Sequence, residues 1–314
     1  MNPRLLARAM PWVFVLIWST GFVVARLGMP HAPPLRFLST RYALSIVCFL
    51  IWIAASRAPW PRSRSEWQHL AVVGVLLQAG YLGGVWSAVK AGMGAGTAAL
   101  LVGLQPVLTA LWVTAHTPSD ATGVAGRDGS QASARITARQ WLGLVLGLAG
   151  LVLVVWRKLG TGEMTVLGFS MAMLALFSIT AGTLYQKRFV RPCDVRTAGT
   201  VQMLAALVVT LPLALFEQEP MVMDPELIAA IAWSVLGLTL GGSSLLYLLI
   251  QRGAATQVSS LMYLVPPCTA LLAWLMFDEP FTVMMAIGLA LTAVGVALVT
   301  AFAGRPRGVH KVGD

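Results

Sequence analysis

Ten apolar runs, each long enough to cross a lipid bilayer, constrain this 314-residue chain more than any other feature. A transmembrane helix needs about 20 predominantly apolar residues. All twelve acidic residues of the chain lie between these runs or at their ends, so no run contains an aspartate or a glutamate. The runs cover Pro11–Gly28, Leu35–Ala55, Trp67–Ala91, Gly94–Ala115, Gln140–Trp156, Met164–Tyr185, Val195–Phe216, Leu227–Ile250, Thr256–Phe277 and Val283–Ala303.

The composition agrees with a chain that spends most of its length in lipid. Charged residues make up only 11% of the sequence, whereas they make up about a quarter of a soluble domain. The mean hydropathy is +0.77. Cys48, Cys193 and Cys268 are far apart and show no paired spacing, so neither a disulfide framework nor a metal site is indicated. The sequence therefore predicts an all-α membrane protein with ten transmembrane helices, and it excludes a soluble enzyme and a secreted disulfide scaffold.

The distribution of basic residues predicts the orientation of these helices. With the N-terminus in the cytoplasm, 16 of the arginines and lysines fall inside and five fall outside, namely Arg26, Arg36, Lys90, Arg157 and Lys158. Such an excess on one side follows the positive-inside rule. The net charge of +10 is then explained by the cytoplasmic membrane face, and a nucleic-acid partner is not expected. Both termini are predicted to be cytoplasmic.

Matching motifs indicate two related halves of five helices each. Leu104–Leu111 and Leu264–Leu271 share Leu, Pro, Thr, Ala and Leu at an offset of 160 residues, and Gly83-Gly84 corresponds to Gly241-Gly242. Because five is odd, the second half must enter the membrane in the opposite sense, which is an inverted repeat of the kind found in secondary transporters. The predicted units are residues 11–156, with a flexible cytoplasmic loop at 116–138, residues 162–303, and a basic cytoplasmic tail at 304–314.

Several short motifs resemble one family in particular. They are Trp18-Ser19-Thr20-Gly21-Phe22, Arg36-Phe37 with Arg41-Tyr42, and the stretch from Tyr263 through Pro266 to Phe277-Asp278-Glu279-Pro280, followed by Gly288 and Gly295. Over residues 11–303 the chain resembles the ten-helix, EamA-type members of the drug/metabolite transporter superfamily. One departure is Ser119, which stands thirteen residues after Pro106, where the family pattern has an acidic residue.

The resemblance implies a secondary transporter of the inner membrane that exports amino acids or related amphipathic metabolites by alternating access. A membrane enzyme, and a receptor or structural membrane protein without transport activity, are the alternatives. The chain lacks the GxxxxGK[ST] motif, so ATP is not expected to drive it, and no cofactor is expected. Proton coupling and facilitated diffusion both stay open. The expected partners are a small metabolite and membrane lipid.

Polar and aromatic residues within the runs are the candidates for contacting a substrate. The absence of acidic residues from the runs argues against a cationic substrate, because intramembrane acids are the usual seats of cation recognition. The predicted substrate-binding residues are Trp18, Ser19, Thr20, Arg41, Tyr81, Trp86, Gln105, Ser244 and Tyr247. For each serine and threonine, packing between helices is the alternative role.

Arg41 is the one basic residue clearly within a run. It lies five residues beyond Arg36, about 7.5 Å deeper along a helix, so its side chain can extend back to the membrane surface. The alternative is that its guanidinium faces the substrate and pairs with a carboxylate or phosphate in a bidentate manner.

Proline and glycine residues within the runs predict hinges and close contacts. Pro106 and Pro266 are expected to bend their helices and act as hinges, with a static kink as the alternative. Small residues at Gly143, Gly147 and Gly150, and at Gly288, Thr292 and Gly295, are expected to pack helices against each other within the chain, with a homodimer contact as the alternative.

Overall fold

The computed structural model describes residues 3–116, 141–143, 145–150, 152–153, 165–242, 244–245, 264–279 and 281–300. Within these ranges all regular secondary structure is helical. The elements are α1 (Pro3–Gly28), α2 (Pro34–Ser56), α3 (Arg64–Gly74), the π-helix η1 (Val75–Leu82), α4 (Gly83–Lys90), α5 (Ala95–Val102), α6 (Gln105–His116), α8 (Val166–Phe189), α9 (Val195–Ala214), α10 (Pro225–Ala232), the π-helix η2 (Trp233–Gly242), α13 (Val265–Phe277) and α14 (Val283–Thr300).

Six continuous helical stretches are long and apolar enough to cross a membrane. They are Ala9–Gly28, Pro34–Ser56, Arg64–Lys90, Val166–Phe189, Val195–Ala214 and Pro225–Gly242. The other four predicted runs contain shorter apolar helices over the described residues, at Ala95–Thr109, Trp141–Gly150, Val265–Phe277 and Val283–Gly295. The chain is therefore an all-helical, multi-pass membrane protein over its described part.

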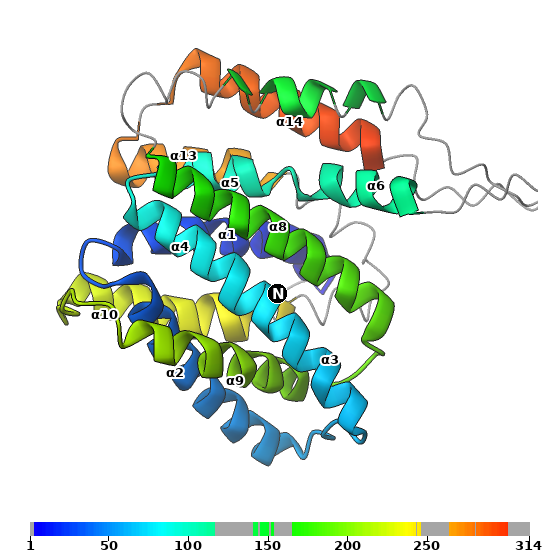
Figure 1. Ribbon diagram of the computed structural model, residues 1–314, viewed down its shortest axis with the longest axis vertical. Helices are drawn as coiled ribbons and strands as arrows, with labels where there is room; N and C mark the ends of the chain where they lie inside the picture. Colours follow the sequence, from blue (N-terminus) through cyan, green and yellow to red (C-terminus); the bar gives the residue numbers. More distant parts are fainter. Residues whose placement is uncertain are drawn as a thin grey trace, which may run out of the picture.

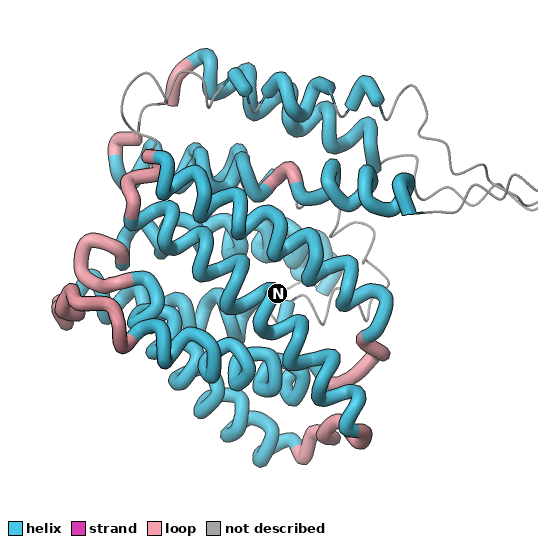
Figure 2. Tube along the Cα trace, in the orientation of Figure 1, coloured by secondary structure: helices cyan, strands magenta, loops and turns pink. Residues whose placement is uncertain are grey.

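The helices run between two ends of a layered bundle, where the connecting loops gather (Figure 1 and Figure 2). In Figure 1, α14 lies at the top, α5, α6 and α13 follow below it, and α2 and α9 lie at the bottom. We call the end that carries the α1–α2, α4–α5, α9–α10 and α13–α14 connections the ion-pair end. The opposite end carries the α2–α3 and α8–α9 loops, residues 57–63 and 190–194, and we call it the arginine end.

Helix α2 shows why these helices suit lipid on one side and protein on the other. Its inward stripe is buried and includes Leu38, Tyr42, Phe49 and Ile53. Its opposite stripe exposes Leu44, Val47, Leu50 and Ile51, of which Ile51 is 66% exposed. An exposed stripe of large aliphatic side chains would be costly in water and is favourable against lipid chains.

Side chains from distant parts of the chain satisfy the free backbone groups at several helix starts. The carboxylate of Glu217 accepts hydrogen bonds from Leu35 N and Arg36 N at 2.9 Å each, at the start of α2. The carboxylate of Glu279 accepts one from Ala95 N at 3.0 Å, at the start of α5. A carboxylate there also complements the partial positive charge of the helix N-terminus. Both acids therefore fix helices of the first half from positions in the second.

The two small-residue faces pack against each other within the chain. A Cβ on Gly150 would lie 2.5 Å from Gly288 O, and a Cβ on Gly295 would lie 2.5 Å from Gly143 O and 2.6 Å from Gly147 N. Only glycine permits backbones to approach this closely. The predicted packing of these faces inside the chain is thus confirmed.

A single methyl group at Gly74, the last residue of α3, is expected to destabilise the fold strongly. A Cβ there would overlap Gln202 O and lie 2.5 Å from Gln202 Cα in α9, so α3 and α9 would have to separate. Gly74→Ala should lower the melting temperature of the purified protein by about 5 °C or more, although alanine favours a helix. The control is Gly83→Ala, where the nearest atom, Leu35 Cδ2, lies at 3.8 Å. Equal melting temperatures for the two variants would contradict this close contact.

Candidate functional site

The most unusual polar group in the described part of the chain is the buried guanidinium of Arg41 on α2. The residue is 7% exposed, so its side chain is enclosed by neighbouring helices. Its Nη2 donates a hydrogen bond to Thr239 Oγ1 of η2 at 3.3 Å. Among the described residues, its buried Nε and Nη1 atoms have no hydrogen-bond partner. Two buried donors of a cation are therefore without an acceptor among the described residues.

Aromatic side chains from α4 and η1 complete the surroundings of Arg41. The guanidinium carbon lies 5.7 Å from the ring centroid of Trp86, within the range of a cation–π interaction. Trp86 is 2% exposed, and its buried Nε1 likewise has no partner among the described residues. Tyr42 and Tyr81, both buried, lie close enough to interact electrostatically with Arg41. The site thus presents unpaired donors beside aromatic faces.

Two π-helices contribute to this site, one from each half of the chain. Tyr81 belongs to η1, and Gln78 of η1 accepts a hydrogen bond at its carbonyl oxygen from the Tyr42 hydroxyl at 2.7 Å. Thr239 belongs to η2, where its hydroxyl donates to Ser234 O, five residues earlier, at 2.9 Å. Wider π-turns occur often at functional sites because they displace backbone and side chains from regular helical positions.

The predicted site residues of α1 form hydrogen bonds away from Arg41. The Ser19 hydroxyl donates to Val15 O at 2.8 Å, and Thr269 of α13 donates to Ser19 O at 3.2 Å. The Thr20 hydroxyl donates to Ile17 O and accepts from Trp233 Nε1 at 2.8 Å. Trp18 is half-buried and packs on Phe14, with ring centroids 5.3 Å apart. Ser19 and Thr20 therefore join α1 to α13 and η2.

The remaining predicted site residues form hydrogen bonds to partners other than Arg41 or lie outside the described residues. Gln105 Nε2 donates to Thr183 Oγ1 of α8 at 2.7 Å, and the Ser244 hydroxyl donates to Leu240 O at 2.5 Å. Tyr247 lies outside the described residues. Of the predicted residues, the structure brings together Arg41, Tyr81 and Trp86, and it adds Tyr42 and Thr239.

The helical stretch that contains Pro106 is interrupted just before the proline. Helix α5 ends at Val102 and α6 begins at Gln105, so Pro106 lies in the first helical turn, where a missing N–H leaves no hydrogen bond unmade. Pro266 occupies the same position in α13. The helical stretch is thus interrupted at Gly103-Leu104, just before Pro106, and the hinge roles of Pro106 and Pro266 stay predictions. A Cβ on Gly103 would lie 2.9 Å from Pro266 Cγ, so this break contacts the start of α13.

Hydrogen bonds and pairs of oppositely charged side chains connect the loops at the ion-pair end of the bundle. Arg36 donates to Ala214 O at 3.2 Å and Glu219 O at 3.0 Å, and Lys90 donates to Met29 O at 3.0 Å. The side-chain pairs across this end are Arg26–Glu279 at 3.7 Å, His31–Asp224 at 2.5 Å, His31–Glu226 at 3.0 Å and Lys90–Glu219 at 2.5 Å, and the His31 contacts are ion pairs only when the imidazole is protonated. Each of these pairs joins a residue before position 95 to a residue after position 215. The acidic residues of these loops thus lie beside Arg26, Arg36 and Lys90, the three described basic residues that the positive-inside rule assigns to the outer side.

Comparisons with known proteins agree on one family. The family model of the EamA-like transporter family matches residues 9–115 and again residues 166–301. An uncharacterized transporter of Archaeoglobus fulgidus is 26% identical over 296 residues, covering 91% of this chain and 94% of that protein. A probable amino-acid metabolite efflux pump of Salmonella typhimurium is 23% identical over 292 residues, covering 90% of each.

A solved structure supports the arrangement of the helices. A crystal structure whose protein carries no functional name superimposes with a TM-score of 0.60, covering 96% of this chain and all of the other at 21% sequence identity. Identity at this level supports a shared fold alone. Together with the two matches of the family model, which cover most of the sequence, it leads to one assignment: this chain belongs to the EamA-like transporter family and is a multi-pass membrane transporter of the drug/metabolite type.

Proposed function

We propose that this protein is a secondary transporter that exports amino acids or related small amphipathic metabolites across the inner membrane by alternating access. The observation that carries the substrate class is the buried Arg41 side chain. Two of its donor atoms, and the nearby Trp86 Nε1, have no hydrogen-bond partner among the described residues. All three atoms donate, and one group carries a positive charge, so the complementary ligand presents acceptor oxygens and a negative charge. A carboxylate meets both requirements, and the name of the Salmonella relative agrees with this class.

The aromatic faces supply the apolar half of this recognition. Trp86 and Tyr81 are buried beside the guanidinium, so an apolar side chain of the ligand can be desolvated against them while its carboxylate pairs with Arg41. Arginine binds carboxylates with two parallel hydrogen bonds, which fixes the orientation of the ligand. Arg41 forms no ion pair with another described residue, so the ligand need not displace an internal carboxylate.

Two inverted halves, residues 11–156 and 162–303, are proposed to alternate around this site. The double match of the family model supports this division. So do the two π-helices, because η1 begins at Val75 and η2 at Trp233, 158 residues later, and the pairs Gly83-Gly84 and Gly241-Gly242 have the same separation. Related halves of opposite orientation can exchange shapes, which produces inward-open and outward-open states.

The ion-pair end is proposed to form the outer gate in its closed state. Each ion pair there connects the two proposed halves, for instance Lys90 with Glu219, so opening this end requires the pairs to separate. Under the positive-inside rule this end faces outward, and the arginine end and both termini face the cytoplasm. The loop at 116–138 and the tail at 304–314 are then cytoplasmic, although they lie outside the described residues for the most part.

Reporter fusions test this orientation and the inverted arrangement together. A fusion after residue 124 should report the cytoplasm, and a fusion after Glu219 should report the outside. Paired reporters, one active only in the cytoplasm and one only outside, measure both positions independently. If both fusion sites report the same compartment, the ten-helix arrangement and the inverted repeat are both wrong.

A thermal-shift measurement tests the substrate class. The purified protein is heated with each of the common amino acids in turn, because a ligand that binds only the folded state raises the melting temperature. At least one amino acid should raise the melting temperature of the wild type and leave that of Arg41→Lys unchanged. A shift of equal size in both proteins would place the binding site elsewhere, and no shift in either would contradict an amino-acid substrate.

A further inference from the structure

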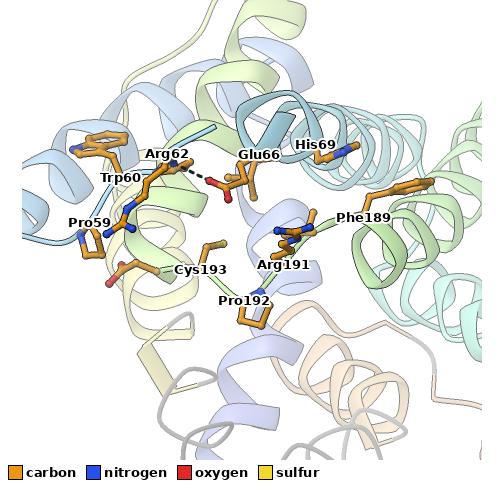
Figure 3. A pocket seen from close by; sticks show the side chains of 13 residues that line it. Pro59, Trp60, Arg62, Glu66, His69, Phe189, Arg191, Pro192 and Cys193 are labelled. Carbon is orange, nitrogen blue, oxygen red and sulfur yellow. Dashed lines mark hydrogen bonds between the residues drawn. The ribbon is translucent and has the colours of Figure 1, made fainter. Parts of the chain in front are cut away.

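A second site lies at the arginine end, far along the helices from the Arg41 group. A pocket of about 230 Å³ opens there between the α2–α3 loop and the α8–α9 loop. Its lining includes Trp60, Arg62, Glu66, His69, Arg191 and Cys193 (Figure 3). In this view Arg62 and Arg191 lie on opposite sides of Glu66 and Cys193. None of the residues that line this pocket contributes to the Arg41 group or to the ion-pair end.

The walls of the pocket are fixed by contacts between the two halves. His69 of α3 forms a hydrogen bond of 2.8 Å with the Tyr185 hydroxyl of α8 and stacks on Phe189, with ring centroids 5.3 Å apart. Thr197 Oγ1 of α9 donates to Pro59 O at 3.0 Å. The pocket is therefore preformed, and any occupant contacts loops from both halves at once.

The charge around the pocket is strongly positive. Residues 57–69 and 187–196 together contain seven arginines and lysines but only two acidic residues. Asp194 is engaged with Arg196, whose Nη2 lies 2.6 Å from its carboxylate, and this hydrogen bond holds the pKa of Asp194 below its usual range. Glu66 accepts hydrogen bonds from Arg62 N at 2.8 Å and Ser63 N at 3.3 Å. Neither carboxylate forms an ion pair with Arg62 or Arg191 within the described residues.

The pocket lies at the ends of membrane-crossing helices, the level at which lipid headgroups are expected. It is built at the ends of α2 and α8 and at the beginnings of α3 and α9, all of which belong to membrane-crossing stretches. Trp60 and Trp67 stack with ring centroids 5.7 Å apart and are 39% and 38% exposed. Partly exposed tryptophans at helix ends are typical of the membrane–water interface. The exposed aliphatic stripe of α2 continues from this level into the membrane.

We propose that this pocket binds the phosphate of an anionic phospholipid headgroup, held between Arg62 and Arg191, and that the bound lipid joins the two halves at the arginine end. Arginine is well suited to phosphate oxygens, and basic pockets between membrane helices on the cytoplasmic side bind anionic headgroups. Because the occupant contacts both loops, it stabilises the arrangement in which these loops are close together. The proposal is independent of the substrate at Arg41.

The lipid dependence of the melting temperature tests this proposal. Short-chain phosphatidylglycerol is added to the detergent-purified protein, with phosphatidylcholine of the same chain length and inorganic phosphate in parallel. Phosphatidylglycerol alone should raise the melting temperature of the wild type, by about 5 °C. Arg62→Gln/Arg191→Gln should lose this rise. The matched control is Arg57→Gln/Arg64→Gln, which removes the same charge from the α2–α3 loop and the start of α3 without changing a residue of the pocket lining, and it should keep the rise.

Three results would overturn the proposal. The first is an unchanged rise in Arg62→Gln/Arg191→Gln, and the second is an equal loss in both double variants, which indicates a diffuse surface charge effect. The third is an equal rise with inorganic phosphate, which assigns the pocket to a soluble phosphate-bearing ligand.

Chemical labelling of the exposed Cys193 thiol, which lines the pocket, provides a second test of lipid binding that needs no variant. Burial of part of the side chain, with the nearby charges of Glu66 and Asp194, raises the pKa of Cys193, so labelling with a maleimide is measured at alkaline pH. In the wild type, phosphatidylglycerol should slow the labelling of Cys193 about tenfold, and phosphatidylcholine should not. Equal labelling rates in the two lipids would contradict a headgroup in the pocket.

Discussion

Arg41→Lys is expected to lose most transport while the protein still folds and inserts. Lysine keeps the positive charge and a long stem, but it cannot reproduce two parallel hydrogen bonds to one carboxylate. A charge-assisted hydrogen bond contributes about 1.5–3 kcal/mol, so the loss of one corresponds to a decrease of roughly 10- to 100-fold in transport at low substrate concentration. Initial transport rates of purified protein in proteoliposomes measure this, with abundance and melting temperature determined on the same samples.

The control for this variant is Arg57→Lys, which makes the same substitution at the other end of α2. Arg57 follows the helix at the arginine end and is expected to tolerate lysine without loss of transport. Arg41→Ala should be as inactive as Arg41→Lys. Wild-type transport by Arg41→Lys, with Arg41→Ala merely less abundant, would show that the guanidinium does not bind the substrate.

Cross-linking of the ion-pair end is expected to abolish transport reversibly. In the structure, Lys90 Nζ lies 2.5 Å from a carboxylate oxygen of Glu219. With both residues replaced by cysteine, and Cys48, Cys193 and Cys268 by alanine, a short bis-methanethiosulfonate reagent should join positions 90 and 219. If this end must open during each cycle, the joined protein cannot release substrate outward. Transport should therefore fall to the level of protein-free vesicles and recover on reduction.

The single variants Lys90→Cys and Glu219→Cys, treated with the same reagent, separate the link from the modification itself. Each lacks the second thiol and should keep most of its transport after treatment. Full transport by the cross-linked double variant, with the link verified by mass spectrometry, would show that the ion-pair end does not open.

The positions of the helices could be predicted from the sequence because apolar length is a local property. Ten runs were predicted, and six of them coincide with helical stretches long and apolar enough to cross a membrane. The described parts of the other four contain shorter apolar helices, so the count of ten membrane crossings stays a prediction. Close packing of the two small-residue faces within the chain was predicted from their spacing, whereas the contacts of Gly150 with Gly288 and of Gly295 with Gly143 come from the structure. The interruption of the helix at Gly103-Leu104 was not predicted, because a proline at 106 suggests only a bend. The close contact of Gly103 with Pro266 at the start of α13 depends on a distant part of the chain.

The site was predicted only in part, because burial and pairing depend on neighbours from distant helices. The isolation of Arg41 within an apolar run indicated its importance, and Trp86 and Tyr81 were predicted among the substrate-binding residues, but their position beside Arg41 comes from the structure. Thr239 gave no signal, since a threonine in an apolar run is an ordinary packing residue until a π-helix places it beside a guanidinium. Ser19 and Thr20 had the residue types of ligands, and their observed hydrogen bonds join helices.

Efflux from proteoliposomes tests the central claim most directly. Vesicles that contain the purified wild type, Arg41→Lys or no protein are loaded with an equimolar mixture of the common amino acids, and the external medium is analysed by mass spectrometry over time. At least one amino acid should leave the wild-type vesicles well above the protein-free rate, and its efflux should fall to near that rate with Arg41→Lys. Identical efflux of every amino acid from all three preparations would contradict a transporter of amino acids that works through Arg41.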